Sequence, residues 1–458
     1  MDPSQPTPGI DDGTAALTQA LLERLRGRMN LIQPAAERRA LVAETLGGLL
    51  ADHHGNGFPA LATEPERRAF VERFLAYDCI EELLADPSVE DIVINSTSPI
   101  FVHRAGEGLM KTERRFATAR ALDLFVRKLI VFGGRSEVDP INDLELADVR
   151  GRVNIVQSPF GPQITIARGK TQPLTILQLI DTGMLSHELA AQLWLYVEGL
   201  RVRPANLLIS GGPSAGKTTL LNALLSFLPS KDRTVIIEDT LELNTSFLEN
   251  CSRLESCRRV KTPALVKNSL RMRPERILVG EVRGEEANDL MTTMNLGKYC
   301  MGTLHASTAR ETVLRLQHEP MNVPPVLVSL IDVFVILRKM NTAGQVRRVV
   351  SELVESAGME KEVVLLSTVW SYDVAKGKTV ECAPSSVYRD KLAAESGRAA
   401  REIMEETARR AEVLARMSAS GRFSDIASVT CFCQRYSDDP AQAMVELGMK
   451  PGAPTRPQ

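Results

Sequence analysis

The apolar residues near the start of the chain recur with the period of a helix. Helical patterns continue to about residue 76, with a break at the polar sequence DHHGNG, residues 52–57. The adjacent His53 and His54 of that break have no acid or cysteine spaced as a further metal ligand, so we expect a solvated loop. We predict a disordered tail at 1–14, rich in Pro, Gly and Asp, and a helical region at 15–76. The first helical face is marked by Leu17, Leu21, Leu22 and Leu25.

The pattern then changes from helical to alternating. The sequence from Ile80 to Arg104 indicates a short helix followed by strands, and a helix is expected near 117–132. Further strand patterns follow in RVNIVQS and QITIARG. Together these predict a small α+β domain at 77–171, followed by a linker at 172–185.

Strands, loops and helices alternate through the next part of the chain. Residues 186–383 have the pattern of an α/β domain with a mostly parallel sheet. Residues 384–458 are predicted to form a helical C-terminal region. Its apolar positions keep helical spacing and are expected to form a docking or core face: Met404, Ala408, Ala411 and Ala415.

Composition narrows the class of protein. The 458 residues are 44% hydrophobic and 24% charged, which is typical of a soluble globular protein. The formal net charge of −2 gives no overall attraction to nucleic acid, so no nucleic-acid partner is expected. The longest apolar stretch, Val326 to Leu337, is too short to span a bilayer, and the N-terminus lacks the pattern of a signal peptide. The seven cysteines form no C-x2-C pair, which favours reduced thiols in a cytosolic protein over a zinc site.

One motif predicts nucleotide binding. The strand pattern ANLLIS runs directly into GGPSAGKT, which has the P-loop spacing G-x4-G-K-[ST], and a helical leucine pattern follows. Such a loop points its backbone amides at phosphate oxygens, and the helix N-terminus adds a favourable dipole. Lys217 would contact the β- and γ-phosphates, and Thr218 would offer its hydroxyl to Mg²⁺. The predicted nucleotide-binding residues are Gly211, Gly212, Pro213, Ser214, Ala215, Gly216, Lys217, Thr218 and Thr219.

Acidic residues follow two predicted strands. TVIIEDTLEL contains Glu238, Asp239 and Glu242, and RILVGEVRG places Gly280 where many nucleotide hydrolases have an aspartate, with Glu281 next. Acids at the carboxyl ends of parallel strands lie where α/β sheets bind ligands. Phosphoanhydride hydrolysis requires one carboxylate near the metal and another to orient a water molecule. Alternatively, these acids only begin polar loops.

A histidine and several arginines complete the candidate set. His305 ends a further strand pattern, in MNLGKYCMGTLHAST, where it is expected to lie near the γ-phosphate rather than to serve only as a structural residue. The arginines between the motifs are either solvated or, for one or two of them, directed to a phosphate or a neighbouring subunit. They are Arg253, Arg258, Arg259, Arg271, Arg273, Arg276 and Arg283.

Together these motifs resemble the secretion-superfamily ATPases, the ring motors of type II secretion, type IV pili and archaella, and most closely the CpaF/TadA-type motors of tight-adherence (Flp) pili. The resemblance rests on GGPSAGKT, IIEDTLEL, SLRMRPERILVGEVRGEEA and GTLHASTARET, in the order of the family, and on LLADPSVEDIVINSTSPIFVHR before them. It implies a RecA-like P-loop domain preceded by a small α+β (PAS-like) domain, with helical N- and C-terminal extensions.

The resemblance also implies roles for individual residues. Gly280-Glu281 is the form expected in this family, with Glu281 on the Mg²⁺ side, supported by Glu238 and Asp239. Glu242 would activate the attacking water, and His305 would sense the γ-phosphate. The arginines of the small domain that could approach ATP, held between the two domains, are Arg152 and Arg168.

At a larger scale the resemblance implies a homo-oligomer, expected to be a hexamer. It would be cytoplasmic and attached peripherally to the inner membrane through a platform protein of a pilus or secretion system. A type IV secretion hexamer and a DNA-handling motor are the alternatives. The chain departs from the family at Lys298, where a histidine is usual, so this lysine either replaces that histidine or reverses the local charge. It also lacks the four-cysteine zinc module of the type II secretion branch.

Overall fold

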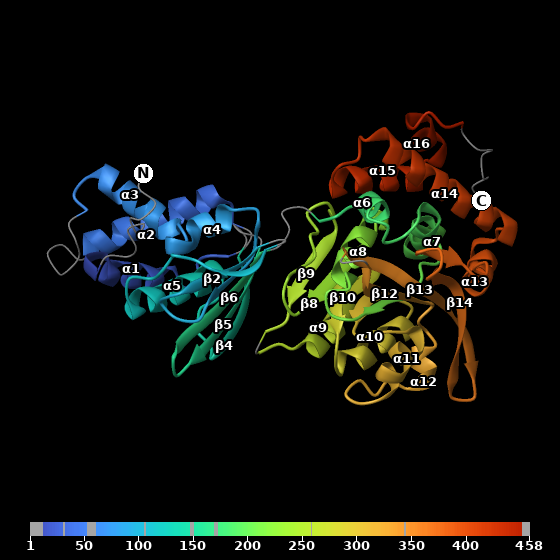
Figure 1. Ribbon diagram of the computed structural model, residues 1–458, viewed down its shortest axis with the longest axis horizontal. Helices are drawn as coiled ribbons and strands as arrows, with labels where there is room; N and C mark the ends of the chain where they lie inside the picture. Colours follow the sequence, from blue (N-terminus) through green and yellow to red (C-terminus); the bar gives the residue numbers. More distant parts are fainter. Residues whose placement is uncertain are drawn as a thin grey trace. The chain divides into compact units, whose positions relative to one another are not determined.

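The structure is a computed structural model that describes residues 12–30, 33–52, 61–104, 107–146, 151–168, 173–257, 259–342 and 345–450. The chain divides into two compact units, Met1–Thr171 and Gln172–Gln458, each with its own sheet (Figure 1). Among the helices of the described residues, none combines the length and apolar character that crossing a bilayer requires.

The first unit packs helices on an antiparallel sheet. The sheet has the strand order β3-β2-β1-β6-β5-β4. Its strands are β1 (Val89–Ile94), β2 (Ile100–Arg104), β3 (Gly108–Lys111), β4 (Ile141–Leu146), β5 (Gly151–Ser158) and β6 (Gly161–Arg168). The helices are α1 (Asp12–Leu25), α2 (Ala35–Asp52), α3 (Glu64–Leu75), η1 (Asp78–Ile80), α4 (Glu81–Ala85) and α5 (Ala119–Phe132). The four leucines of the first helical pattern are buried in α1, because their spacing places them on one face.

Two predictions near the N-terminus concern residues that lie partly or wholly outside the described part of the chain. Helix α1 begins at Asp12, inside the segment predicted to be disordered, while residues 1–11 lie outside the described part. The histidines of the predicted loop, His53 and His54, also lie outside it.

The second unit is built on a nine-stranded sheet with the order β15-β14-β13-β12-β7-β11-β10-β8-β9. The strands from β12 to β9 in this order are parallel, and β13, β14 and β15 extend the sheet in antiparallel fashion. The strands are β7 (Leu207–Gly211), β8 (Thr234–Glu238), β9 (Cys251–Glu255), β10 (Arg276–Val282), β11 (Tyr299–Leu304), β12 (Val333–Thr342), β13 (Gln345–Glu360), β14 (Val363–Asp373) and β15 (Lys378–Glu381). The predicted α/β fold class with a RecA-like P-loop domain is confirmed.

Helices cover both faces of this sheet and form two hydrophobic clusters (Figure 1). One face is covered by α9 (Thr262–Ser269), α10 (Glu286–Asn295), α11 (Ala309–Gln317) and α12 (Pro325–Val328), with η4 (Leu270–Met272). The other is covered by α6 (Ile176–Asp181), α7 (His187–Glu198), α8 (Lys217–Leu224), η3 (Leu225–Phe227) and the C-terminal helices α13 (Val387–Ser396), α14 (Ala400–Ser420), α15 (Ile426–Asp438) and α16 (Pro440–Glu446). The short η2 (Gly199–Arg201) follows α7.

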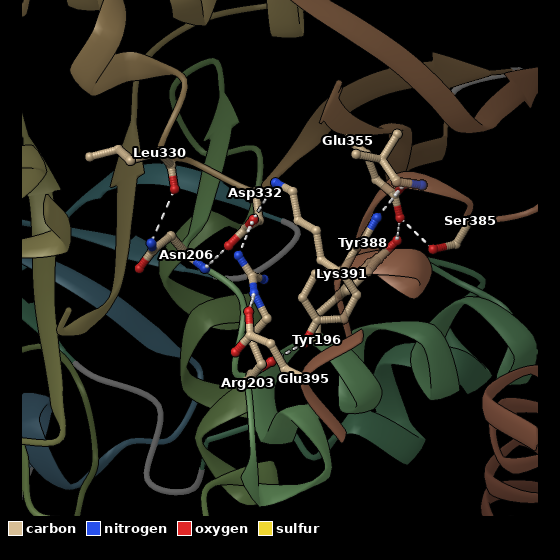
Figure 2. A network of polar contacts seen from close by, with 11 residues as sticks. Tyr196, Arg203, Asn206, Leu330, Asp332, Glu355, Ser385, Tyr388, Lys391 and Glu395 are labelled. Atoms are coloured by element: carbon tan, nitrogen blue, oxygen red, sulfur yellow. Dashed lines mark hydrogen bonds and ion pairs between the residues drawn. The ribbon is translucent and has the colours of Figure 1, made fainter. Parts of the chain in front are cut away.

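The C-terminal helices are joined to the sheet by buried polar contacts. The Glu355 side chain on β13 is fully buried, and its Oε2 accepts the backbone N–H groups of Val387 and Tyr388 at 3.0 and 3.2 Å, at the start of α13 (Figure 2). Its Oε1 accepts the hydroxyl of Tyr196 on α7 at 2.7 Å. A buried carboxylate is costly unless it is fully hydrogen-bonded, so these contacts fix α13, α7 and β13 to one another.

Candidate nucleotide-binding site

The loop between β7 and α8 has the backbone of a phosphate-binding loop. Gly216 has a φ of 97° and Ser214 a φ of 55°, both in the left-handed region that makes successive amides turn to one side. Gly216 supplies this conformation without a steric cost, and it is the N-cap residue of α8. Lys217 begins the helix, so Thr218 and Thr219 lie in its first turn, where free N–H groups attract anions.

The Lys217 side chain is buried beside neutral hydrogen-bond acceptors. Its residue is only 8% exposed, and its Nζ donates to the carbonyl oxygens of Gly211 and Gly212 at 3.0 and 3.3 Å. Burial lowers the pKa of Lys217, while the charges of Glu281 and Glu242 act in the opposite direction. Both carboxylates therefore lie within electrostatic reach of this ammonium.

His305 connects the lysine to the acid of the neighbouring strand. The Lys217 Nζ lies 3.2 Å from His305 Nδ1, and His305 Nε2 lies 2.8 Å from Glu281 Oε1. An ammonium can only donate, so we assign the Nδ1 as acceptor and place the ring proton on Nε2, from which it is donated to the carboxylate. The sheet order β7-β11-β10 explains this sequence of contacts, because His305 directly follows β11, between the P-loop strand and the strand that carries Glu281.

The glycine before Glu281 is required by a close approach. A Cβ atom at Gly280 would lie 3.0 Å from Glu238 Cγ and 3.6 Å from Glu238 Oε1. The Gly280 carbonyl accepts the hydroxyl of Thr303 at 2.7 Å, which fixes the strand at this point. Any side chain at position 280 would crowd the buried Glu238, which favours a glycine there and an acid at the next residue.

Glu238 holds the loop on which Glu242 lies. Glu238 is only 3% exposed, and its Oε1 accepts the backbone N–H groups of Glu242 and Leu243 at 2.9 and 3.0 Å. Its Oε2 lies 3.5 Å from a guanidinium nitrogen of Arg253. Burial raises the pKa of Glu238 to about 7, against the lowering effect of these partners. Glu242 itself is exposed at the surface.

An arginine bridges the two groups of acids. The Arg283 guanidinium lies 3.0 Å from Glu281 Oε2 and 3.3 Å from Asp239 Oδ2. The other oxygen of Asp239 accepts the hydroxyls of Ser256 and Thr262, both at 2.8 Å. Arg283 therefore lies at the candidate site and neutralises part of its negative charge.

Three of the other candidate arginines lie away from the candidate site. Arg276 is 2% exposed and forms an ion pair with Asp232 at 2.6 Å, which is a structural role. Arg271 and Arg273 precede β10 and so lie at the edge of the sheet opposite the P-loop. Arg259 lies between β9 and α9, and Arg258 is outside the described residues.

The two arginines predicted from the small domain both belong to the first unit. Arg152 on β5 lies 3.8 Å from Asp143, and Arg168 at the end of β6 donates to the Val89 carbonyl at 3.1 Å. Their role toward a nucleotide stays a prediction.

Lys298 lies far from the candidate site along its strand. It directly precedes β11, whereas His305 directly follows the same strand. The length of this strand separates the two by about 20 Å. An effect of Lys298 on the charge around the phosphates is therefore not supported by its position.

Sequence reasoning missed one residue of the P-loop surroundings. Arg348 on β13 donates from its Nε to the Ser214 carbonyl at 2.9 Å, although 134 residues separate the two in sequence. No motif surrounds Arg348, and only the pairing of β12 with β7 and β13 brings it to the loop. No pattern in the sequence would have pointed to it.

The donor set fits a magnesium-bound triphosphate. The first turn of α8 offers free amides, and the buried Lys217 ammonium contacts neutral acceptors that an anion can replace. The Thr218 hydroxyl and the Glu281 carboxylate are oxygen ligands of the kind that Mg²⁺ binds.

The chain matches one known protein family over most of its length. The family described as Type II/IV secretion system protein matches residues 76–364, more than half of the chain. The chain belongs to this family. The finer assignment to the tight-adherence branch stays a prediction.

The individual proteins that match share only low sequence identity with the chain. An uncharacterized protein of Methanocaldococcus jannaschii, MJ0900, is 32% identical over 358 residues, covering 74% of this chain and 64% of its own length. The chain thus spans less than two thirds of that relative. A putative conjugal transfer protein of Mycobacterium tuberculosis, Rv3659c, is 31% identical over 257 residues, covering 52% of this chain and 71% of its own. Among solved structures, the ATPase DotB of Legionella pneumophila is similar at 17% identity and a TM-score of 0.45, covering 83% of this chain and 93% of its own.

Proposed function

We propose that this protein hydrolyses ATP with Mg²⁺ and works as a motor of a pilus or secretion system. The observation that carries the proposal is the continuous contact from Lys217 through His305 to Glu281, with Glu242 acting on the same lysine. These are the parts that phosphoanhydride hydrolysis requires, and they meet at the carboxyl edge of one parallel sheet. Membership of the secretion family supports the same activity.

In this mechanism the amides of the P-loop and the first turn of α8 bind the phosphates. Lys217 exchanges its Gly211 and Gly212 carbonyl partners for the β- and γ-phosphates, because an ammonium is better satisfied by an anion than by neutral oxygens. Thr218 and Glu281 would hold Mg²⁺, which would neutralise part of the negative charge of the phosphates.

Glu242 then orients the attacking water and accepts its proton. The buried Glu238 fixes the backbone of the Glu242 loop, so Glu238 acts by positioning rather than by contact with the reacting atoms. His305 contacts both Lys217 and Glu281, so a new partner for either residue changes the hydrogen bonding of the imidazole. This gives His305 the properties of a γ-phosphate sensor.

We further propose that the protein acts as a homo-oligomeric ring, a hexamer, on a membrane platform protein of a Flp/Tad-type pilus. It would be cytoplasmic and peripheral to the inner membrane. A type IV secretion motor that exports protein or DNA is the second candidate, supported by the similarity to a putative conjugal transfer protein. A DNA-handling motor is disfavoured by the net charge of −2.

The activity is tested by phosphate release from the purified full chain with Mg²⁺ and ATP. The wild type should turn over, Lys217→Ala should bind no ATP, and Glu281→Gln should bind ATP without hydrolysing it. Wild-type phosphate release from either variant would refute the site. Mass measurement with and without a non-hydrolysable ATP analogue tests the ring, which a monomer under both conditions would refute.

A further inference from the structure

Arg348 contacts the P-loop from a strand that lies outside every nucleotide-binding motif of the sequence. Its Nε donates to the Ser214 carbonyl at 2.9 Å. Its aliphatic part also approaches the loop, because a Cβ at Gly216 would lie 3.5 Å from Arg348 Cδ. The side chain therefore packs along the segment that has to present its amides to the phosphates.

The segment that Arg348 contacts has an unfavourable backbone conformation. Ser214 has a φ of 55°, which non-glycine residues adopt only where the surroundings stabilise it. A hydrogen bond from a charged donor to the carbonyl of the same residue is a contact of that kind. Without this contact, the loop would have access to conformations in which the amides of residues 214–216 no longer point to one side.

The strand that carries Arg348 is held by contacts of its own. Two residues further along β13, the Val350 N–H donates to the Met184 carbonyl at 2.9 Å. Further along the same strand, the buried Glu355 joins α7 and α13 through the network in Figure 2. The Arg348 backbone is thus anchored to the second unit independently of the P-loop.

We propose that Arg348 is a positioning residue that sets the nucleotide affinity of the P-loop through the Ser214 carbonyl. The inference rests on the proposed function, since it assigns a role within the same site. Arg348 stabilises the loop in its phosphate-binding conformation before the nucleotide arrives, so it contributes to binding and not to the chemical step. Glu242 and Glu281 follow or belong to β8 and β10, which β12, β7 and β11 separate from β13 in the sheet, so they keep their geometry when Arg348 is removed.

The chain offers a matched control for the charge of Arg348. Arg347 is the preceding residue of β13, is also exposed and directs its side chain to the opposite face of the sheet. Within the described residues the Arg347 side chain has no hydrogen bond or ion pair. Arg347→Ala therefore removes the same charge from the same strand without removing the contact to Ser214.

The test measures the binding of a fluorescent ATP analogue with Mg²⁺, together with ATP turnover, for the full-length wild type and its variants. Arg348→Ala should weaken binding and raise KM by about tenfold, the effect of losing one hydrogen bond from a charged donor, with kcat within about twofold of the wild type. Arg348→Lys should be weakened similarly, because it keeps the charge but lacks the Nε–H group. Arg347→Ala should bind within about twofold of the wild type.

Hydrogen exchange provides a readout that does not depend on nucleotide. In its absence, the P-loop peptide 211–216 should exchange faster in Arg348→Ala than in the wild type and Arg347→Ala. If Arg348→Ala and Arg347→Ala weaken nucleotide binding equally, the effect comes from long-range charge and the proposal is overturned. Wild-type nucleotide binding by Arg348→Lys would also overturn it. If Arg348→Ala does not fold, Arg348→Lys decides the question. A wild type that binds no nucleotide overturns the proposed function as well, whereas loss of binding in Lys217→Ala with wild-type binding in Arg348→Ala overturns only the role of Arg348.

Discussion

Replacing Gly280 by alanine tests the reason why this chain has a glycine before its strand-end acid. The added Cβ would lie 3.0 Å from Glu238 Cγ, which is closer than most Cβ atoms approach another carbon, and at an ordinary contact distance of 3.6 Å from Glu238 Cβ. Glu238 is buried and hydrogen-bonded to the backbone of Glu242 and Leu243, so a shift of its side chain by a few tenths of an ångström also changes these two hydrogen bonds. Gly280→Ala therefore acts on the Glu242 loop through Glu238.

The size of the effect follows from this contact. Overpacking of a well-packed interior costs about 1–3 kcal/mol in the free energy of unfolding. For a unit of this size, that corresponds to a decrease of roughly 2–10 °C in Tm. A displacement of the Glu242 loop by a fraction of an ångström should lower kcat by about tenfold to a hundredfold, since catalytic geometry is this sensitive to misplacement. Nucleotide affinity should change little, because the P-loop is not contacted.

The assay combines urea unfolding of the full chain with ATP turnover at saturating nucleotide. Gly212→Ala is the comparison for stability, because a Cβ at that position would meet no atom within 4 Å, and its unfolding should match the wild type. Wild-type stability and kcat in Gly280→Ala would refute the steric argument. The double variant Gly280→Ala, Glu238→Asp should show favourable coupling in unfolding, because the shorter side chain makes room for the added methyl group.

Two further predictions concern the protonation of Glu238 and the position of Lys298. The raised pKa of Glu238, about 7 against 4.5 for a free carboxyl, means that the folded chain binds a proton more tightly than the unfolded chain. Stability should therefore decrease by on the order of 3 kcal/mol as the pH rises from about 4.5 to about 7, and Glu238→Gln should lose this slope in urea unfolding across that range. A slope unchanged in the variant would assign it to other groups. Lys298→His should keep wild-type ATP turnover because position 298 lies at the opposite end of β11 from His305; inactivation with intact folding would show a role that this position does not explain.

The sequence was informative where a local pattern carries the chemistry. The P-loop, the acids at the carboxyl ends of β8 and β10 and His305 could be expected near one another because strand ends in a parallel sheet meet at one edge. The interpretation of Gly280 needed coordinates, because the atom that excludes a side chain there belongs to Glu238, on a different strand. The roles of the arginines also needed them, since Arg276 and Arg283 differ in their surroundings and not in their spacing from the motifs.

Contacts between segments that are far apart in the sequence could not be predicted from it. Arg348 reaches the P-loop only because β13 folds back on β12, and nothing in the residues around it marks this contact. Likewise, the helical pattern near the C-terminus pointed to the wrong side of its helix, because Met404 and Ala408 are exposed and Ala411 and Ala415 only half-buried. The apolar residues that α14 buries are Ile403, Val413, Leu414 and Met417. In the structure α14 packs along α7, and buried Arg410 pairs with Glu406 at 2.9 Å and with Glu198.

The packing of the C-terminal helices on α7 has a consequence for truncated forms of the protein. The span shared with the secretion family ends at residue 364, within β14. A chain cut there would keep Phe227 stacked on the Trp194 indole but would remove Tyr436, which lies against the same indole. It would also remove the backbone N–H groups at the start of α13 that donate to the buried Glu355 carboxylate. Such a fragment should expose apolar surface and precipitate, so the proposed ATP turnover is best measured on the full chain.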